Sequence, residues 1–513
     1  MSFFSISVLA VHYFLLSALC IYGVHRIYHT LVAQSATRID TIDSQLTFAD
    51  CDLPHVTVQA PIFNERLVVE RLIDSLVALD YPREKIQIQV LDDSTDETVM
   101  LAANRIAEWR TKGINITHIH RKDRQGFKAG ALEEALASAS GDYIAIFDAD
   151  FLPPVGFLKK AIPYFSSPEI GMVQTRWSHL NRDHNLLTRV QSIMLDAHFG
   201  IEQIARSKMG AFFNFNGTAG VWRKKTISDA GGWQSDTLTE DLDLSYRAQL
   251  KDWEFRYIRD IRCPSELPVN MAAFKTQQHR WAKGAIQVMK RLLVRVWKSS
   301  VPLTTKIEAT FHLTGNVSYM LMFIDSLFFL LPAVHIREQA SLSFLAWFDI
   351  PLFFLATLSH AFFFIFSQKI LHENFLSQLK VLPALLSMSI GLGVNNGRAV
   401  IEALVGYTTD FIRTPKTGNV TQEIAIPSKR RKKQNGKAWS TYNAVSAHWA
   451  DRLEIVLGGA YLGYFFWAGM NGYWIVMPFL ALFSLGFLFT GLLSVTERHN
   501  FNFSFARPAV KSA

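Results

Sequence analysis

Cysteine is scarce in this chain of 513 residues, and charged side chains make up only 19% of it. The three cysteines, Cys20, Cys51 and Cys263, are odd in number and too far apart for the spacing of a zinc site. A disulfide framework is therefore excluded, and a reducing compartment is expected. The sequence has no internal repeat and no low-complexity tract, and its 49% share of hydrophobic residues excludes a disordered protein.

The first long apolar run covers residues 3–24, and crossing a bilayer takes about 20 residues. It lacks the positive start and the small-residue cleavage site of a signal peptide. Basic residues follow it, among them Arg26 and Arg38, so the positive-inside rule places the next segment in the cytoplasm. We predict a retained transmembrane anchor over residues 1–30.

Between residues 52 and 300 the pattern changes to short β-rich strings separated by polar stretches of helical length. Such alternation is typical of βαβ units with a parallel sheet. The sequence therefore predicts one cytosolic α/β domain over residues 52–300.

The remaining residues, 301–513, contain four strongly apolar runs and one weaker run, residues 381–406, which carries several polar side chains. The strong runs are residues 311–334, 344–367, 453–470 and 473–494. A basic run over Lys429–Lys433 is expected in a cytoplasmic loop. If the α/β domain and this basic run are both cytoplasmic, an even number of spans must separate them. We therefore predict five spans in the whole chain, with 381–406 lying at the interface. A full span there would place the basic run outside, and that alternative stays open.

Two aspartates, Asp325 and Asp349, fall inside apolar runs, where a carboxylate is costly and usually faces a cavity or a partner. Each either lines a polar path through the membrane or lies near an interface. The sequence does not choose between the two interpretations.

Acidic side chains follow two of the predicted strands directly. Asp92 and Asp93 close one strand, and Asp148 and Asp150 close another. Ligands of open α/β sheets bind beyond the carboxyl ends of the strands, so both pairs are expected at one crevice. The D-x-D spacing suits a hard divalent cation that bridges the phosphates of a substrate.

Two further elements stand closer to the membrane segments. Thr239, Glu240 and Asp241 open a helical pattern, either as a helix cap or as functional groups, whereas Asp243 is assigned to the helix start alone. The string Gln277–Trp281 is either an interfacial anchor or an anion clamp in which an arginine lies against a ring.

The order of these elements resembles the family 2 glycosyltransferases, specifically the processive, membrane-embedded β-glycan synthases of the cellulose-synthase type. The matching strings are PIFNE (61–65), DDS (92–94), GFKAGAL (126–132), DAD (148–150), NGTAGVWR (216–223), TED (239–241) and QQHRW (277–281). QTRW (174–177) and DAGGW (229–233) are most similar to the cellulose-synthase-like glucomannan and glucan synthases. The resemblance, dense over residues 55–285, implies an α/β GT-A-like nucleotide-sugar transferase domain inserted in an α-helical transmembrane region.

The resemblance also implies roles for individual residues. Asp148 and Asp150 are expected to hold Mg or Mn at the donor diphosphate, and Asp241, beside Glu240, is expected to take the proton of the acceptor hydroxyl. The residues expected at the nucleotide and diphosphate are Asp92 or Asp93, Glu65, Lys128, Gln277 and Gln278. Arg280 and Trp281 complete the Q-x-x-R-W element, and the expected sugar platforms are Trp222, Trp233 and Trp281.

One more string, FIRTPK (411–416), resembles the F-x-V-T-x-K gating loop that closes over the nucleotide in cellulose synthase, and we place a gating-like loop at 411–418. Arg413 replaces the valine, and Pro415 stiffens the loop. Thr414 and Lys416 are expected at phosphate. The alternative is a juxtamembrane basic loop.

The predicted activity is that of an inverting, metal-dependent hexosyltransferase in the plasma or inner membrane, or in the Golgi of a eukaryote. It polymerises a β-glucan or (gluco)mannan, expected to be 1,4-linked, from UDP-glucose or GDP-mannose onto a growing glycan, and translocates the product across the lipid bilayer. The alternative is a single-transfer enzyme with a ceramide or polyprenyl-phosphate acceptor. The motifs leave the sugar and any accessory subunit open.

Two classes without this activity are disfavoured. A non-catalytic receptor or scaffold would tolerate loss of the acidic motifs, and none is lost. A nucleic-acid-binding protein would gather its basic residues on one face, whereas the surplus behind the net charge of +8 lies in loops that flank the membrane.

Overall fold

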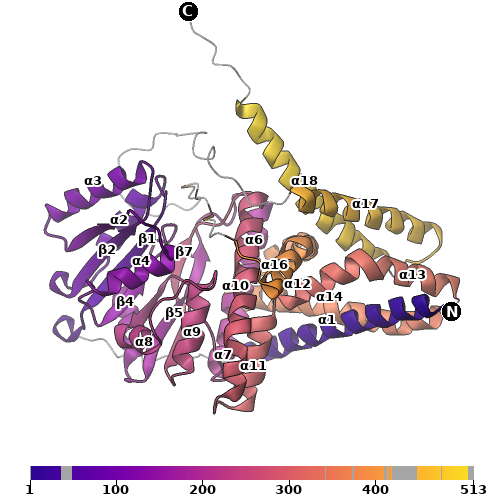
Figure 1. Ribbon diagram of the computed structural model, residues 1–513, viewed down its shortest axis with the longest axis horizontal. Coiled ribbons are helices and arrows are strands. Elements are labelled where there is room, and N and C mark those ends of the chain that lie inside the picture. The colour runs from indigo at the N-terminus through magenta and orange to yellow at the C-terminus, as the bar shows by residue number, and fades with distance from the viewer. Residues whose placement is uncertain are drawn as a thin grey trace, which may run out of the picture.

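The computed structural model describes residues 2–35, 49–340, 342–372, 375–409, 413, 414, 416, 418, 448–474 and 476–505. An α/β domain lies at one end of the molecule and a bundle of long helices at the other, with α6 and α10 between them (Figure 1). The basic run Lys429–Lys433 lies outside the described residues.

One mixed sheet of seven strands forms the centre of the α/β domain. In chain order the strands are β1 (Val56–Ile62), β2 (Ile86–Asp92), β3 (Ile116–His120), β4 (Tyr143–Ile146), β5 (Ile170–His179), β6 (Gly220–Arg223) and β7 (Glu254–Ser265). Their spatial order is β3-β2-β1-β4-β6-β5-β7. The predicted parallel pairing holds for β3, β2, β1 and β4, but β6 runs antiparallel to both its neighbours. The prediction of a parallel sheet was therefore only partly right.

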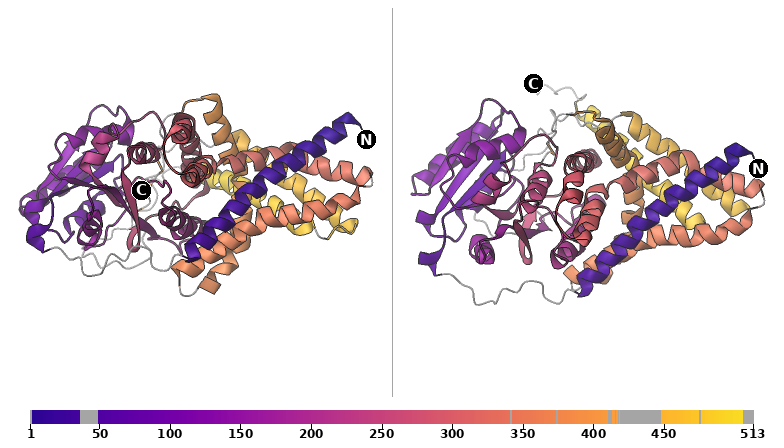
Figure 2. Two further views of the ribbon diagram at one scale, coloured as in Figure 1. Left: turned by 90° about the horizontal axis from the view of Figure 1, so that it is seen from below. Right: turned by 60° about the horizontal axis from the view of Figure 1, so that its bottom comes forward.

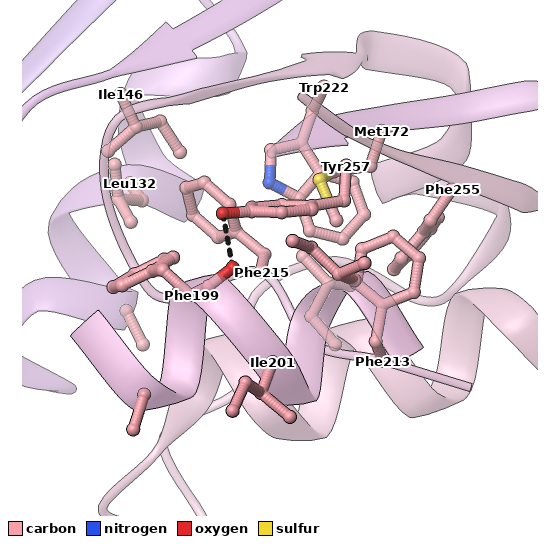
Figure 3. Close-up of a cluster of buried hydrophobic side chains, with 14 of the residues drawn as sticks. Leu132, Ile146, Met172, Phe199, Ile201, Phe213, Phe215, Trp222, Phe255 and Tyr257 are labelled. Atoms are coloured by element: carbon pink, nitrogen blue, oxygen red, sulfur yellow. Dashed lines mark hydrogen bonds between the residues drawn. The ribbon is translucent and has the colours of Figure 1, made fainter. Parts of the chain in front are cut away.

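Short helices surround this sheet. They are α2 (Val69–Val77), α3 (Thr98–Arg110), α4 (Phe127–Leu136), α5 (Phe157–Ala161), α6 (Leu186–Ala197), α7 (Gln203–Lys208), α8 (Lys224–Asp229) and α9 (Glu240–Gln249). The cluster in Figure 3 packs aromatic rings of the sheet against the segment around Phe199, whose carbonyl accepts a 2.7 Å hydrogen bond from the Tyr257 hydroxyl. The same buried cluster includes Phe363 and Leu385 of the membrane helices, so the domain and the bundle share a core.

The other helices form the membrane-facing half of the molecule. They are α1 (Phe3–Ser35), α10 (Met271–Lys298), α11 (Leu303–Thr314), α12 (Val317–Ile324), α13 (Leu330–Gln339), α14 (Ala346–Leu371), α15 (Leu382–Gly391), α16 (Gly393–Val405), α17 (His448–Met470) and α18 (Met477–Phe505). Figure 2 shows α1 running diagonally along this bundle. Within the described residues, six stretches are long and apolar enough to cross a membrane: Phe3–Ser35, Val317–Arg337, Ile350–Leu371, Phe375–Val405, Trp449–Met470 and Met477–Glu497. The chain is an integral membrane protein.

The fourth of these stretches contains the segment predicted to lie at the interface. Its polar side chains have partners on α10, because the Asn395 amide donates to the Lys275 carbonyl at 2.9 Å and the Lys283 ammonium donates to Glu402 at 3.0 Å. The polarity of α16 thus reflects contact with a neighbouring helix. Whether the segment spans the bilayer or lies at the interface stays a prediction.

Several buried polar contacts hold the bundle together. Asp325 accepts a 2.8 Å hydrogen bond from His12 of α1, so it links two helices. The Lys275 ammonium lies 2.9 Å from Asp451 and 2.5 Å from Glu454, and all three residues are at most 2% exposed. The side chain of Asp349 is not among those described.

Candidate active site

The acidic motifs meet because three parallel strands end at the same edge of the sheet. Ile62 pairs with Asp92 at the ends of β1 and β2, and Gln59 pairs with Ile146 at the end of β4. The antiparallel strand β6 begins opposite Ile146 and so carries the NGT string to this edge. There the Thr218 hydroxyl accepts a 2.9 Å hydrogen bond from the backbone N–H of Asp148.

An open cleft lies between these strand ends and the N-terminal parts of α9 and α10. Most of the side chains predicted from the sequence line it: Glu65, Asp93, Lys128, Asp148, Asp150, Glu240, Asp241, Gln277, Arg280, Trp281, Thr414 and Lys416. Gln278 lines an adjoining cavity instead.

The structure separates the two neighbouring aspartates that the sequence left equivalent. Asp92 is fully buried and accepts hydrogen bonds from His118 at 2.9 Å and from the backbone of Ser94 at 2.8 Å, and these contacts lower its pKa against the effect of burial. Asp93 lines the cleft and receives two hydrogen bonds of 2.7 Å from Arg121. Of the two aspartates, Asp93 is therefore the one whose side chain lines the cleft.

Lys128 connects the metal motif with the TED motif. Its ammonium lies 2.5 Å from Asp148 and 3.9 Å from Glu240, and it donates to the Gly217 carbonyl at 2.9 Å. Although burial opposes the charge, these carboxylates raise the pKa of Lys128. The positively charged Lys128 ammonium therefore lies beside the carboxylates of Asp148 and Glu240 in the cleft.

Asp241 lies in the first turn of α9, where its carboxylate accepts a 2.8 Å hydrogen bond from the backbone of Leu242. Burial and the neighbouring charge of Glu240 raise the pKa of Asp241 to about 7, against the opposing effect of Lys128 and Arg280. A carboxylate with a pKa near neutrality is well matched to general base catalysis.

The gating-like segment contacts this cleft through its described residues. Arg413 donates to both oxygens of Glu65 at 2.9 and 3.0 Å, and the Lys416 ammonium lies 2.7 Å from Asp150. Each aspartate of the D-x-D motif thus contacts one ammonium. Two carboxylates separated by one residue, both lining the cleft, supply the hard oxygen ligands that Mg and Mn prefer, so the donor set fits such an ion.

A second cavity, which is also open to solvent, continues from the cleft toward the membrane helices. Trp177, Asp241 and Trp281 line both spaces. The far part of the second cavity is lined by residues of α1, α11 and α12, among them Tyr22 and Phe311. The candidate base therefore faces the donor cleft on one side and a space beside the bundle on the other.

The structure corrects two predictions. Trp222 and Trp233 are 0% and 5% exposed and belong to the hydrophobic core, with ring centroids 6.0 Å apart, so their assignment as sugar platforms is wrong. Thr239 precedes α9, but within the described part of the chain its side chain makes no capping hydrogen bond. Asp243 is buried and paired with Arg247 at 2.6 Å, which confirms its structural assignment.

Sequence reasoning missed two residues of the cleft. Arg124 places its guanidinium 3.4 Å from the centre of the Phe63 ring, and Trp177 lies between the two cavities. Trp177 closes the QTRW string, which was a signal for the family but was given no role. Arg124 precedes the GFKAGAL string by two residues and carried no signal of its own.

Strained backbone accumulates within the motifs. Asn64, Phe127 and Ala219 have φ angles of 53°, 51° and 54°, which side chains other than glycine rarely adopt. All three belong to motif strings whose other members line the cleft. Such strain is typical of functional sites, where the surrounding structure holds it in place.

Comparison with known proteins gives a consistent result. Residues 57–228 match the model of "Glycosyl transferase family 2", and residues 143–366 match that of "Glycosyl transferase family group 2". A probable glucomannan 4-beta-mannosyltransferase from Oryza sativa subsp. japonica is 47% identical over 251 residues, which cover 48% of this chain and 46% of the relative. A glucomannan 4-beta-mannosyltransferase from Arabidopsis thaliana is 42% identical over 274 residues, covering 51% of each chain. The chain spans about half the length of the curated relatives it matches.

Among solved structures, a mannosyltransferase from Pyrobaculum calidifontis, in complex with GDP-Man and Mn²⁺, has the same fold. The TM-score is 0.53 at 20% identity, and the match covers 78% of this chain and all of the other. The domain is a GT-A-like α/β domain flanked by long apolar helices, as the resemblance implied, although its sheet is mixed and not parallel throughout.

Proposed function

Since this chain belongs to the family 2 glycosyltransferases, we propose that it transfers mannosyl units from GDP-mannose to the 4-hydroxyl of a growing β-linked glucomannan. The identity to glucomannan 4-beta-mannosyltransferases over the catalytic domain supports this assignment. The domain faces the cytosol, where nucleotide sugars are made, and the bilayer is that of the plasma or inner membrane, or of the Golgi.

The residues of the cleft have distinct parts in this reaction. Asp241 accepts the proton of the acceptor hydroxyl, which then attacks the anomeric carbon from the face opposite the leaving diphosphate, so that configuration is inverted. Lys128 and Arg280 provide fixed positive charge beside the departing diphosphate. Asp148 and Asp150 would hold Mg or Mn, which when bound neutralises diphosphate charge. Asp93 and Glu65 lie on the nucleotide side.

The observation that carries this proposal is the position of Asp241 between the two cavities. A base that serves donor and acceptor at once must lie where the two spaces meet, and Asp241 and Trp281 line both. The second cavity runs beside α1, α11 and α12, so an acceptor in it points toward the bundle. This arrangement supports a polymer that leaves through the membrane.

The product decides between a polymer and a single transfer. Purified protein in lipid is given radiolabelled GDP-mannose or UDP-glucose, and the products are separated by size and digested with an endo-β-1,4-mannanase. We expect high-mass, mannanase-sensitive product from GDP-mannose. Label confined to organic-soluble lipid would instead identify a ceramide or polyprenyl-phosphate acceptor and overturn the polymer assignment.

The raised pKa of Asp241 predicts the pH dependence of the transfer. The base is active only when deprotonated, and its pKa in the free protein is about 7. Below that value kcat/KM, which reports the free enzyme, should fall about tenfold per pH unit. Because the charge of Glu240 helps to raise this pKa, Glu240→Gln should shift the acidic limb to lower pH. A flat profile down to pH 5 would contradict the assignment.

Metal removal provides a separate test of the D-x-D pair. Treatment with EDTA should abolish transfer, and Mn²⁺ or Mg²⁺ should restore it, because both carboxylates face the cleft. In Asp150→Asn the metal concentration needed for half-maximal restoration should rise at least about tenfold, as expected when a ligand is lost. Full activity in EDTA would refute metal dependence.

A further inference from the structure

Two histidines of α1 and one glutamate of α11 form a cluster of donor atoms outside the motifs. His25 and His29 lie four residues apart, so both side chains project from one face of the helix. Their Nε2 atoms lie 2.8 and 2.9 Å from the two oxygens of Glu308. All three donor atoms lie within 4.8 Å of one another.

The contact of His29 has the distance of a hydrogen bond without its geometry. His29 is 2% exposed, and its Nε2 makes no hydrogen bond with any described residue. A buried nitrogen without a hydrogen bond that faces a carboxylate, here one that already accepts from His25 and Arg206, is a candidate ligand for a cation.

The charges around the cluster favour a cation. Arg206 lies 3.1 Å from Glu308 and 3.6 Å from Glu202, so one guanidinium serves two carboxylates. With the histidines neutral, the group carries one net negative charge. The hydrogen bond from His25, the contact with His29 and the charge of Arg206 keep the pKa of Glu308 well below its usual range.

We propose that His25, His29 and Glu308 bind one divalent cation of the zinc type. Two imidazole nitrogens and one carboxylate oxygen are a ligand set that zinc uses. Its bonds of about 2.0–2.1 Å place neighbouring donors roughly 3–3.5 Å apart. The nitrogen–oxygen distances of 2.8 and 2.9 Å are slightly shorter than that, so the side chains would separate a little around the ion. His25 and His29 also line the second cavity, so a water there completes the coordination. The ion joins α1 to α11 at the wall of the proposed acceptor space.

This site is chemically separate from the D-x-D pair, whose all-oxygen ligands suit Mg or Mn. The test uses untagged full-length protein in detergent, stripped with a chelator, in the background Asp148→Asn/Asp150→Asn so that the cleft does not contribute. Zn²⁺ binding is measured by titration calorimetry and elemental analysis. Co²⁺ serves as a second probe, because its visible absorption distinguishes four-coordinate nitrogen and oxygen ligation.

We expect one equivalent of tightly bound Zn²⁺, a higher Tm in its presence and a four-coordinate Co²⁺ spectrum. His29→Gln should weaken binding at least about tenfold, as loss of a ligand does. The matched control is His198→Gln, because His198 lines the same cavity but bonds to Glu202 at 2.8 Å, outside the donor set. Absence of bound Zn²⁺ in the parent protein, or binding that survives His29→Gln, would overturn the proposal. The parent measurement decides the matter even if the variant does not fold.

Discussion

Replacing Asp241 by Asn abolishes glycosyl transfer while leaving donor binding close to that of the parent protein. The amide keeps the size of the side chain but cannot accept the proton of the acceptor hydroxyl. General base catalysis contributes about 10²–10⁴-fold, so kcat should fall by that factor. Donor affinity should change little, because the proposed nucleotide contacts are made by other side chains of the cleft, Asp93 and Glu65.

The measurement pairs product formation from GDP-mannose with titration of GDP in the presence of Mn²⁺. Asp229→Asn is the matched control, since Asp229 ends α8 at the surface and pairs only with Lys225 among the contacts described, at 2.7 Å. It should retain full activity. Parent-like turnover in Asp241→Asn would remove the base assignment, and loss of GDP binding would show that Asp241 belongs to the donor site.

The place of the active site could be predicted from the sequence because strand ends define it. Apolar strings that close in DD and DAD mark the carboxyl edge of a parallel sheet, and Asp93, Asp148 and Asp150 do line one cleft. The order of the motif strings, which resembles that of the family, added Asp241 and the residues of α10 to the predicted site. What the order could not provide was the side of the strand on which each residue lies.

Asp92 and Asp93 illustrate that limit. Successive side chains of a strand point to opposite faces, so one of two adjacent aspartates must turn away from the cleft. Which one turns depends on the neighbours that cover each face, here His118 for Asp92. The prediction for Trp222 was wrong for the same reason. Its four-residue strand lies antiparallel between β4 and β5, and no local sequence signal indicated that pairing or the face on which Trp222 lies.

Contacts between distant segments were equally out of reach. The apolar run of the sequence ends at residue 24, but helix α1 continues to Ser35 and so brings His25 and His29 close to the α/β domain. Their partner Glu308 lies 283 residues from His25 along the chain. Pairings of this kind are set by how the helices pack, and a single sequence contains no pattern for them.

The largest loss of stability is expected from Lys275→Met. Lys275 of α10 is buried between Asp451 and Glu454 of α17, with nitrogen–oxygen distances of 2.9 and 2.5 Å. Methionine fills similar volume but leaves two carboxylates together without their cation. Removing one partner of a buried ion pair costs about 3–5 kcal/mol, so the free energy of unfolding should fall by that amount. A marked drop in Tm in detergent would report it.

A second variant distinguishes uncompensated buried charge from lost side-chain packing as the cause of this destabilisation. If uncompensated charge is the cause, the triple variant Lys275→Met/Asp451→Leu/Glu454→Met should regain much of the Tm, because apolar groups of similar volume replace a buried ionic cluster at little cost. The surface change Lys225→Met, which breaks an exposed pair with Asp229, should alter stability by less than about 1 kcal/mol. A Tm unchanged in Lys275→Met would contradict the argument.

Since Lys275 precedes Gln277 by two residues on α10, the same ionic cluster fixes the Q-x-x-R-W element against the bundle. Recovery of Tm without recovery of transfer in the triple variant would indicate that this link positions the active site as well as stabilising the fold.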